Sequence, residues 1–115
     1  MQKLPSLIIG GSDGQTIRQL GKVSNRHGLI AGATGTGKTV TLQVLAEGFS
    51  RMGVQVFAAD IKGDLSGIAA EGTSKDFIDK RLVDVGLPPF SPRAYPTVMN
   101  LLPTGVLGLV FAALI

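Results

Sequence analysis

Residues 28–39 read GLIAGATGTGKT, a short apolar run followed at once by a glycine-rich stretch that ends in Lys and Thr. The last eight of these residues, 32–39, match the pattern GxxxxGK[ST] at every defined position. The pattern needs a strand before it and a helix after it, because the loop must turn between the two. The apolar run at 28–31 has no polar alternation, so it predicts a strand covered on both faces.

The residues after the loop predict a helix. Leu42, Leu45 and Phe49 fall at positions i, i+3 and i+7 and form one apolar stripe. The helix is expected to run from about residue 37 to residue 52, since Gly53 can adopt the left-handed conformation that ends many helices. The loop therefore stands between a predicted strand and a predicted helix, as the pattern requires.

This pattern is typical of a loop that binds polyphosphate. Phosphate oxygens need many donors at short range, and backbone N–H groups supply them only where side chains leave space. Lys38 is expected to reach the β and γ phosphates as the catalytic residue, and the Thr39 hydroxyl is expected to ligate Mg2+. A glycine-rich turn with an incidental lysine is the alternative, which the flanking elements disfavour. The predicted nucleotide contacts in the loop are Gly32, Ala33, Thr34, Gly35, Thr36, Gly37, Lys38 and Thr39.

A second strand, buried like the first, is predicted at residues 54–59, which are mostly β-branched or apolar, and Asp60 ends it. Because ligands bind at the carboxyl ends of parallel strands, Asp60 is a candidate contact of the nucleotide. An Asp after a strand is equally a turn former or a helix cap, and both interpretations stay open. Lys62 and Asp64 follow in the same loop and are expected to be solvated.

The other elements are predicted from local patterns and turn residues. Their order, with strands and helices alternating, predicts parallel strands joined by right-handed crossovers. These elements are a hairpin of residues 7–9 and 16–20 around a turn at 10–14, a helix at 74–85 capped by Ser74, a short strand near 97–99, and a buried helix from about Gly105.

Composition excludes several classes of protein. The chain has 115 residues, of which 44% are hydrophobic and 17% charged, so it is not a highly charged disordered chain. It has no Cys and one His, which excludes thiolate zinc sites, cysteine nucleophiles and multi-histidine metal sites. The net charge is +3, and the sequence contains no run of basic residues that would indicate nucleic-acid binding.

Targeting signals are not apparent in the sequence. The apolar run near the amino terminus is too short for a signal peptide, so a cytoplasmic location is expected. Residues 94–115 carry no charge, yet their prolines and glycines argue against a membrane span. The sequence stops within this apolar run, so we expect the chain to be cut short.

Three stretches together resemble one family of ATPases. Residues 25–31 lead into the glycine-rich loop, VQVFAAD occupies 54–60, and KGDLSG occupies 62–67. They resemble the HerA-like branch of the HerA and FtsK superfamily of P-loop ATPases, in particular its helicase HerA-like C-terminal domain proteins. The resemblance is close over residues 25–70 and looser over 95–98. It implies an α/β core of RecA-like type with a parallel sheet and flanking helices, ATP hydrolysis, a ring of identical subunits, and DNA as the usual substrate.

One part of the family pattern is missing. The catalytic strand of such ATPases is apolar and ends in Asp-Glu, and residues 61–115 contain no such stretch. We therefore predict an amino-terminal strand or hairpin lead-in at 1–24 and a partial P-loop ATPase core at 25–115. This module is expected to bind ATP with Mg2+, to hydrolyse ATP slowly, to meet DNA through the full-length assembly, and to have no membrane partner. A small P-loop kinase or GTPase and a non-catalytic nucleotide-binding fragment are the alternatives.

Overall fold

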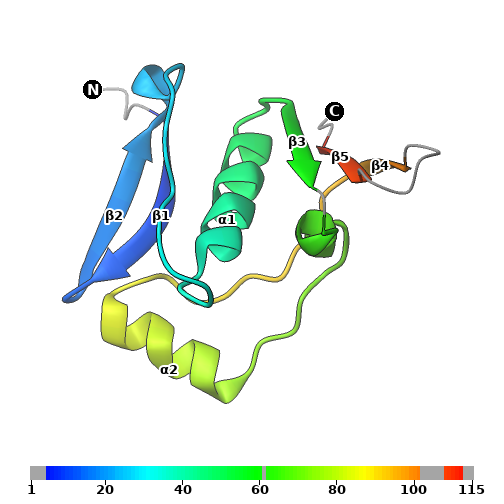
Figure 1. Ribbon diagram of the computed structural model, residues 1–115. Coiled ribbons are helices and arrows are strands. Elements are labelled where there is room, and N and C mark those ends of the chain that lie inside the picture. Colours follow the sequence, from blue (N-terminus) through cyan, green and yellow to red (C-terminus); the bar gives the residue numbers. More distant parts are fainter. Residues whose placement is uncertain (1–4, 61, 102–107, 113–115) are drawn as a thin grey trace. The chain divides into compact units, whose positions relative to one another are not determined.

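The structure is a computed structural model that describes residues 5–60, 62–101 and 108–112. It is an α/β structure with two compact units (Figure 1). The first unit is drawn from residues 1–29 and 72–93, and the second from residues 30–71 and 94–115. The division predicted from the sequence, at residue 24, stays a prediction.

The first unit contains the predicted hairpin. Strands β1 (Ser6–Ser12) and β2 (Gln15–Leu20) pair antiparallel. Asp13 and Gly14 form a two-residue turn with φ of 50° and 74°. Positive φ at both turn positions is the geometry that matches the twist of a hairpin, so Asp-Gly suits this position. The hairpin prediction is confirmed, although the turn is shorter than expected because Gly10 and Gly11 belong to β1.

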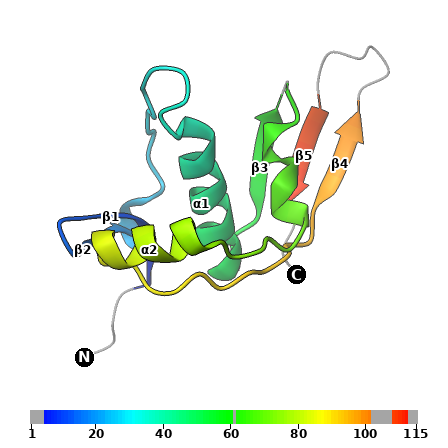
Figure 2. The same ribbon diagram turned by 90° about the horizontal axis from the view of Figure 1, so that it is seen from below.

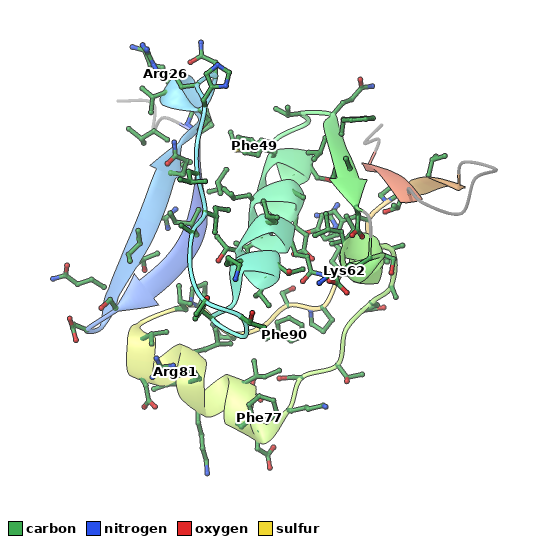
Figure 3. All side chains as sticks on the ribbon, viewed as in Figure 1. Arg26, Phe49, Lys62, Phe77, Arg81 and Phe90 are labelled. Carbon is green, nitrogen blue, oxygen red and sulfur yellow. The ribbon has the colours of Figure 1, made fainter. Side chains whose placement is uncertain are left out.

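The first unit also contains a short 3-10 helix, η1 (Gly21–Val23), and helix α2 (Asp76–Val85), from which Phe77 and Arg81 project (Figure 3). The predicted cap at Ser74 is wrong, because Lys75 occupies the cap position and its carbonyl accepts the N–H groups of Ile78 and Asp79. The Ser74 hydroxyl instead donates to Asp79 Oδ1 at 2.6 Å.

At the other end of α2, Gly86 closes the helix in a left-handed conformation, with φ of 76°. The Gly86 carbonyl accepts the Thr16 hydroxyl of β2 at 3.2 Å. This bond ties the end of α2 to the hairpin within the first unit.

The second unit contains the predicted helix. Helix α1 (Lys38–Arg51) begins after Gly37 and ends before Met52, and Gly53 is left-handed with φ of 80°. These bounds confirm the helix that the apolar stripe and Gly53 predict. Strand β3 (Val56–Asp60) and the 3-10 helix η2 (Asp64–Ala69) follow it.

The core of the second unit lies between β3 and η2. Leu65 and Ile68 are buried, and Val56 and Ala58 of β3 pack against them. Tyr95 is also buried, and its N–H donates to the carbonyl of Ile68 at 3.0 Å. Contrary to prediction, β3 is not covered on both faces. Phe57 is 63% exposed, because Leu65 and Ile68 pack on the other face of β3, against Val56 and Ala58.

The sheet of the second unit is antiparallel, so the predicted parallel pairing is wrong. Strand β5 (Gly108–Ala112) lies between β3 and β4 (Val98–Leu101) and pairs antiparallel with both (Figure 2). Only residues 102–107 connect β4 to β5, and a parallel pair would need a crossover of about a dozen residues or more. The strand predicted near 97–99 is confirmed as β4.

Two sequence-based elements are corrected. Residues 28–31 have no regular secondary structure, and Leu29 is 90% exposed. A strand requires a hydrogen-bonded neighbour, and 28–31 pair with no strand among the described residues. The helix predicted from Gly105 is wrong where the structure describes it, since 108–112 form β5; Gly105 itself lies outside the described residues. A short apolar run fits a strand and a buried helix equally well, and here pairing with β3 decides between them.

Across the described ranges, no helix has both the length and the apolar character that a membrane crossing would need.

Candidate functional site

The glycine-rich loop is an exposed turn that leads directly into α1. Gly35 and Gly37 have φ of 80° and 92°, in the left-handed region where a side chain would be strained. Gly32 has a different reason to lack a side chain, since a Cβ there would lie 2.5 Å from Thr36 Oγ1. The shape of the loop therefore depends on glycine at these three positions.

Thr36 and Lys38 hold the loop together from within. The Thr36 hydroxyl donates to the Ala33 carbonyl at 2.6 Å, and the Thr36 N–H donates to the same oxygen at 3.3 Å. The Lys38 ammonium donates to the carbonyls of Gly32 at 2.8 Å and of Ala33 at 2.7 Å. Because both acceptors belong to the loop, the positive charge of Lys38 lies across the loop.

Helix α1 begins without a side-chain cap. Its N-cap is Gly37, which has no side chain to accept an N–H group, and its first turn contains no acidic residue. The first N–H groups of a helix have no partner inside the helix, and they carry the positive end of the helix dipole. By contrast, α2 has Asp76 and Asp79 in its first turn. The start of α1 therefore offers unpaired donors to an anion, next to the exposed loop.

Asp60 is placed at the end of β3 and is only 8% exposed. Its carboxylate accepts three backbone N–H groups, those of Lys62 at 3.2 Å, Gly63 at 3.0 Å and Leu65 at 2.8 Å. Of the two interpretations left open by the sequence, this is the turn-forming role. A contact between Asp60 and a nucleotide stays a prediction.

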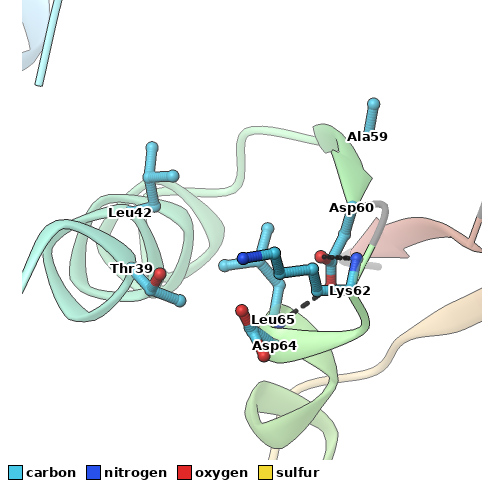
Figure 4. A pocket seen from close by; sticks show the side chains of 7 residues that line it. All are labelled: Thr39, Leu42, Ala59, Asp60, Lys62, Asp64 and Leu65. Atoms are coloured by element: carbon cyan, nitrogen blue, oxygen red, sulfur yellow. Dashed lines mark hydrogen bonds between the residues drawn. The ribbon is translucent and has the colours of Figure 1, made fainter. Parts of the chain in front are cut away.

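A pocket of about 210 Å³ brings the start of α1 together with the residues that follow β3. Figure 4 shows Thr39 of α1 on one side and Lys62 and Asp64 on the facing side. Lys62 and Asp64 are exposed, as predicted, but the sequence does not indicate that they share a pocket with Thr39. Among the described residues, the lining is Thr39, Leu42, Ala59, Asp60, Lys62, Asp64 and Leu65.

Gln43 connects the two sides of this pocket. Its side-chain amide donates to the backbone carbonyl of Asp64 at 3.0 Å. Gln43 lies four residues after Thr39 in α1, so both side chains lie on the same face of the helix. Sequence reasoning did not single out Gln43. The available signal was a polar residue one turn beyond Thr39 on the same face of the predicted helix.

The donor set fits a metal ion bound together with phosphate. Within the ranges that the structure describes, no group of three or more His, Cys, Asp and Glu side chains is placed to hold a metal ion alone. Mg2+ in phosphate sites is usually held by one or two protein oxygens, with phosphates and water completing its shell. The Thr39 hydroxyl and the carboxylates of Asp60 and Asp64 are hard oxygen ligands of the kind that Mg2+ prefers.

A larger pocket, of about 430 Å³, lies along α2 in the first unit. Its lining residues within the described part of the chain all come from that one helix, and they include neither a glycine-rich turn nor a helix start. It is therefore a weaker candidate than the pocket beside Thr39, despite its size. Its lining residues are Asp79, Lys80, Val83 and Asp84.

Comparisons with known proteins identify the family. Searches of curated proteins and of solved structures gave no significant match. The model of the family described as helicase HerA-like C-terminal matches residues 6–110, which is nearly the whole chain. The resemblance stated from the sequence is thereby confirmed, and the chain belongs to the helicase HerA-like C-terminal family.

Proposed function

We propose that this chain is the ATP-binding P-loop module of a HerA-like helicase or translocase ATPase. The observation that carries the proposal is the exposed turn at residues 32–37, whose left-handed glycines lead into an uncapped α1. The finer fold, a P-loop core of RecA-like type, is part of the same proposal. It rests on the order of loop, helix and strand, since the described strands pair antiparallel.

Each part of the loop has a proposed role. The backbone N–H groups from Gly35 to Thr39 would receive the phosphate oxygens of ATP, because they are close to the helix start and side chains leave them accessible. Lys38 would exchange its two loop carbonyls for the β and γ phosphates, and it is the proposed catalytic residue. The Thr39 hydroxyl would hold Mg2+, which supplies charge neutralisation at the phosphates. Asp60, the last residue of β3, is proposed to contact the bound nucleotide.

Hydrolysis by this chain is proposed to be slow. A general base must hold and orient the attacking water, and the sequence after β3 has no apolar strand ending in Asp-Glu to supply one. Binding is therefore the activity to test in this chain. Rapid turnover and action on DNA are proposed for a full-length assembly of several subunits in a ring.

The test is the affinity for Mg-ATP of a Lys38→Ala variant. A charge-assisted hydrogen bond contributes about 1.5 to 3 kcal/mol, so the substitution is expected to weaken binding by about 10- to 150-fold. Isothermal titration calorimetry measures the affinity, and thermal unfolding without nucleotide checks that the variant folds.

Lys80→Ala is the matched control, because Lys80 is an exposed lysine of α2 in the other unit. It is expected to bind Mg-ATP as the unchanged protein does. Equal affinity of the Lys38→Ala variant and the unchanged protein would refute the role of Lys38. Absence of Mg-ATP binding by the unchanged protein would refute the proposed function as a whole.

A further inference from the structure

The carboxylate of Asp60 is largely occupied by the backbone of the loop that follows it. It accepts three N–H groups at distances between 2.8 and 3.2 Å, and its two oxygens offer roughly four acceptor sites in all. Both oxygens take part, Oδ1 with Lys62 and Gly63 and Oδ2 with Leu65. Asp60 therefore fixes the backbone path of residues 62–65.

That fixed path determines where Asp64 lies. Gly63 turns the chain with φ of 77°, and the backbone carbonyl of Asp64 is held from α1 by Gln43. Asp64 is therefore anchored from both sides, by Asp60 through its neighbours and by the helix that begins at the phosphate loop. The backbone of Asp64 is thus held relative to α1 by bonds from two side chains, the Asp60 carboxylate and the Gln43 amide.

The side chain of Asp64 differs from that of Asp60. It is exposed, it lines the pocket opposite Thr39 (Figure 4), and within the described residues its carboxylate has no hydrogen-bond or ion-pair partner. The described lining of the pocket contains two carboxylates and one lysine, a formal charge of one negative that favours a cation. An unengaged carboxylate facing a hydroxyl is a suitable pair of oxygens for Mg2+ that also binds phosphate.

We propose that Asp64 is the carboxylate that binds a water molecule of the Mg2+ shell, with Asp60 and Gln43 as the residues that position it. The proposal rests on the proposed function, since Mg2+ is expected here only together with a nucleotide. It assigns a role to a residue that the sequence indicates only as a solvated loop position.

The test measures how the affinity for a fluorescent ADP analogue depends on Mg2+. In the Asp64→Asn variant, the Mg2+ concentration that gives half-maximal enhancement of binding should rise by about tenfold, the lower end of the effect of an outer-shell partner on metal affinity. Binding of the same analogue in EDTA should be unchanged or slightly tighter, because a negative charge has been removed. Asp64→Glu should restore most of the Mg2+ dependence.

Two further variants separate positioning from general damage. Gln43→Ala should shift the Mg2+ dependence in the same direction while binding in EDTA stays the same, an outcome that a merely structural role would not give. Asp84→Asn removes an exposed carboxylate of α2 in the other unit and should change neither measurement.

The outcomes distinguish this inference from the proposed function. If Asp64→Asn keeps the normal Mg2+ dependence while Lys38→Ala loses binding with and without Mg2+, the role of Asp64 is wrong and the phosphate loop stands. If the unchanged protein does not bind the analogue, the proposed function fails and this inference fails with it.

Discussion

Glu47 lies in α1 one turn before Arg51. Partial burial raises the pKa of its carboxyl above the ordinary value of 4.5, and the nearby positive charge of Arg51 only partly opposes this effect. Because the pKa is raised in the folded protein, folding is favoured while Glu47 is protonated. That stability is fully present below the ordinary pKa and is lost as the pH rises through the folded value.

Glu47→Gln is therefore expected to increase the free energy of unfolding at neutral pH and to have little effect at a pH below the ordinary value of 4.5. Urea denaturation at both pH values measures the difference. Glu71→Gln provides the control for exchanging a carboxyl for an amide at an exposed site. A Glu47→Gln variant that is less stable than the unchanged protein at neutral pH would contradict the assigned cost of burial.

Individual site residues were predicted unevenly from the sequence. The loop from Gly32 to Thr39 could be named because the defined positions of the pattern each have a chemical reason. The main-chain bonds of Asp60 could be expected only as one of two possibilities, since turn formers and ligands both follow strands. Gln43 and Asp64 could not be singled out, because they meet in a contact between α1 and η2 that no local pattern encodes.

The glycine-rich loop leads directly into α1, and the glycines of the loop can be tested separately from Lys38. A Gly32→Ala side chain would meet Thr36 Oγ1 at 2.5 Å, so the bond between Thr36 and Ala33 would have to shift. We expect Mg-ATP to bind about tenfold more weakly, comparable to the loss of one hydrogen bond, with little change in thermal unfolding.

Gly28→Ala is the matched control for this change. Gly28 is also a glycine just before the loop, but a Cβ there meets nothing within 4 Å and its φ is not positive. It should bind Mg-ATP normally. Equal effects of the two substitutions would mean that the close packing inside the loop does not matter for the nucleotide.

Elements with local signals were predicted well, and elements that need a partner were not. Helix α1 has its own apolar stripe and a glycine stop, and the hairpin has its Asp-Gly turn, so both are present as expected. Residues 28–31 look like a strand in composition, yet a strand exists only when another strand pairs with it. Residues 108–112 form a strand for the converse reason, because β3 and β4 supply partners on both sides.

Whether two strands pair parallel or antiparallel depends on the fold of the whole molecule. The alternation of strands and helices predicts parallel pairing, but β5 pairs antiparallel with both β3 and β4, and the short connection between β4 and β5 allows only an antiparallel pair there. Family membership was nevertheless predicted correctly. It depends on residue types around the loop and after β3, which do not change with the pairing of the strands.

The most direct measurement is a crystal structure of this chain with Mg2+ and a non-hydrolysable ATP analogue. We predict that the β and γ phosphates lie against the backbone N–H groups of residues 35–39, with the Lys38 ammonium moved from the loop carbonyls to the phosphate oxygens. A triphosphate bound elsewhere, or a loop whose amides point away from it, would contradict the assignment.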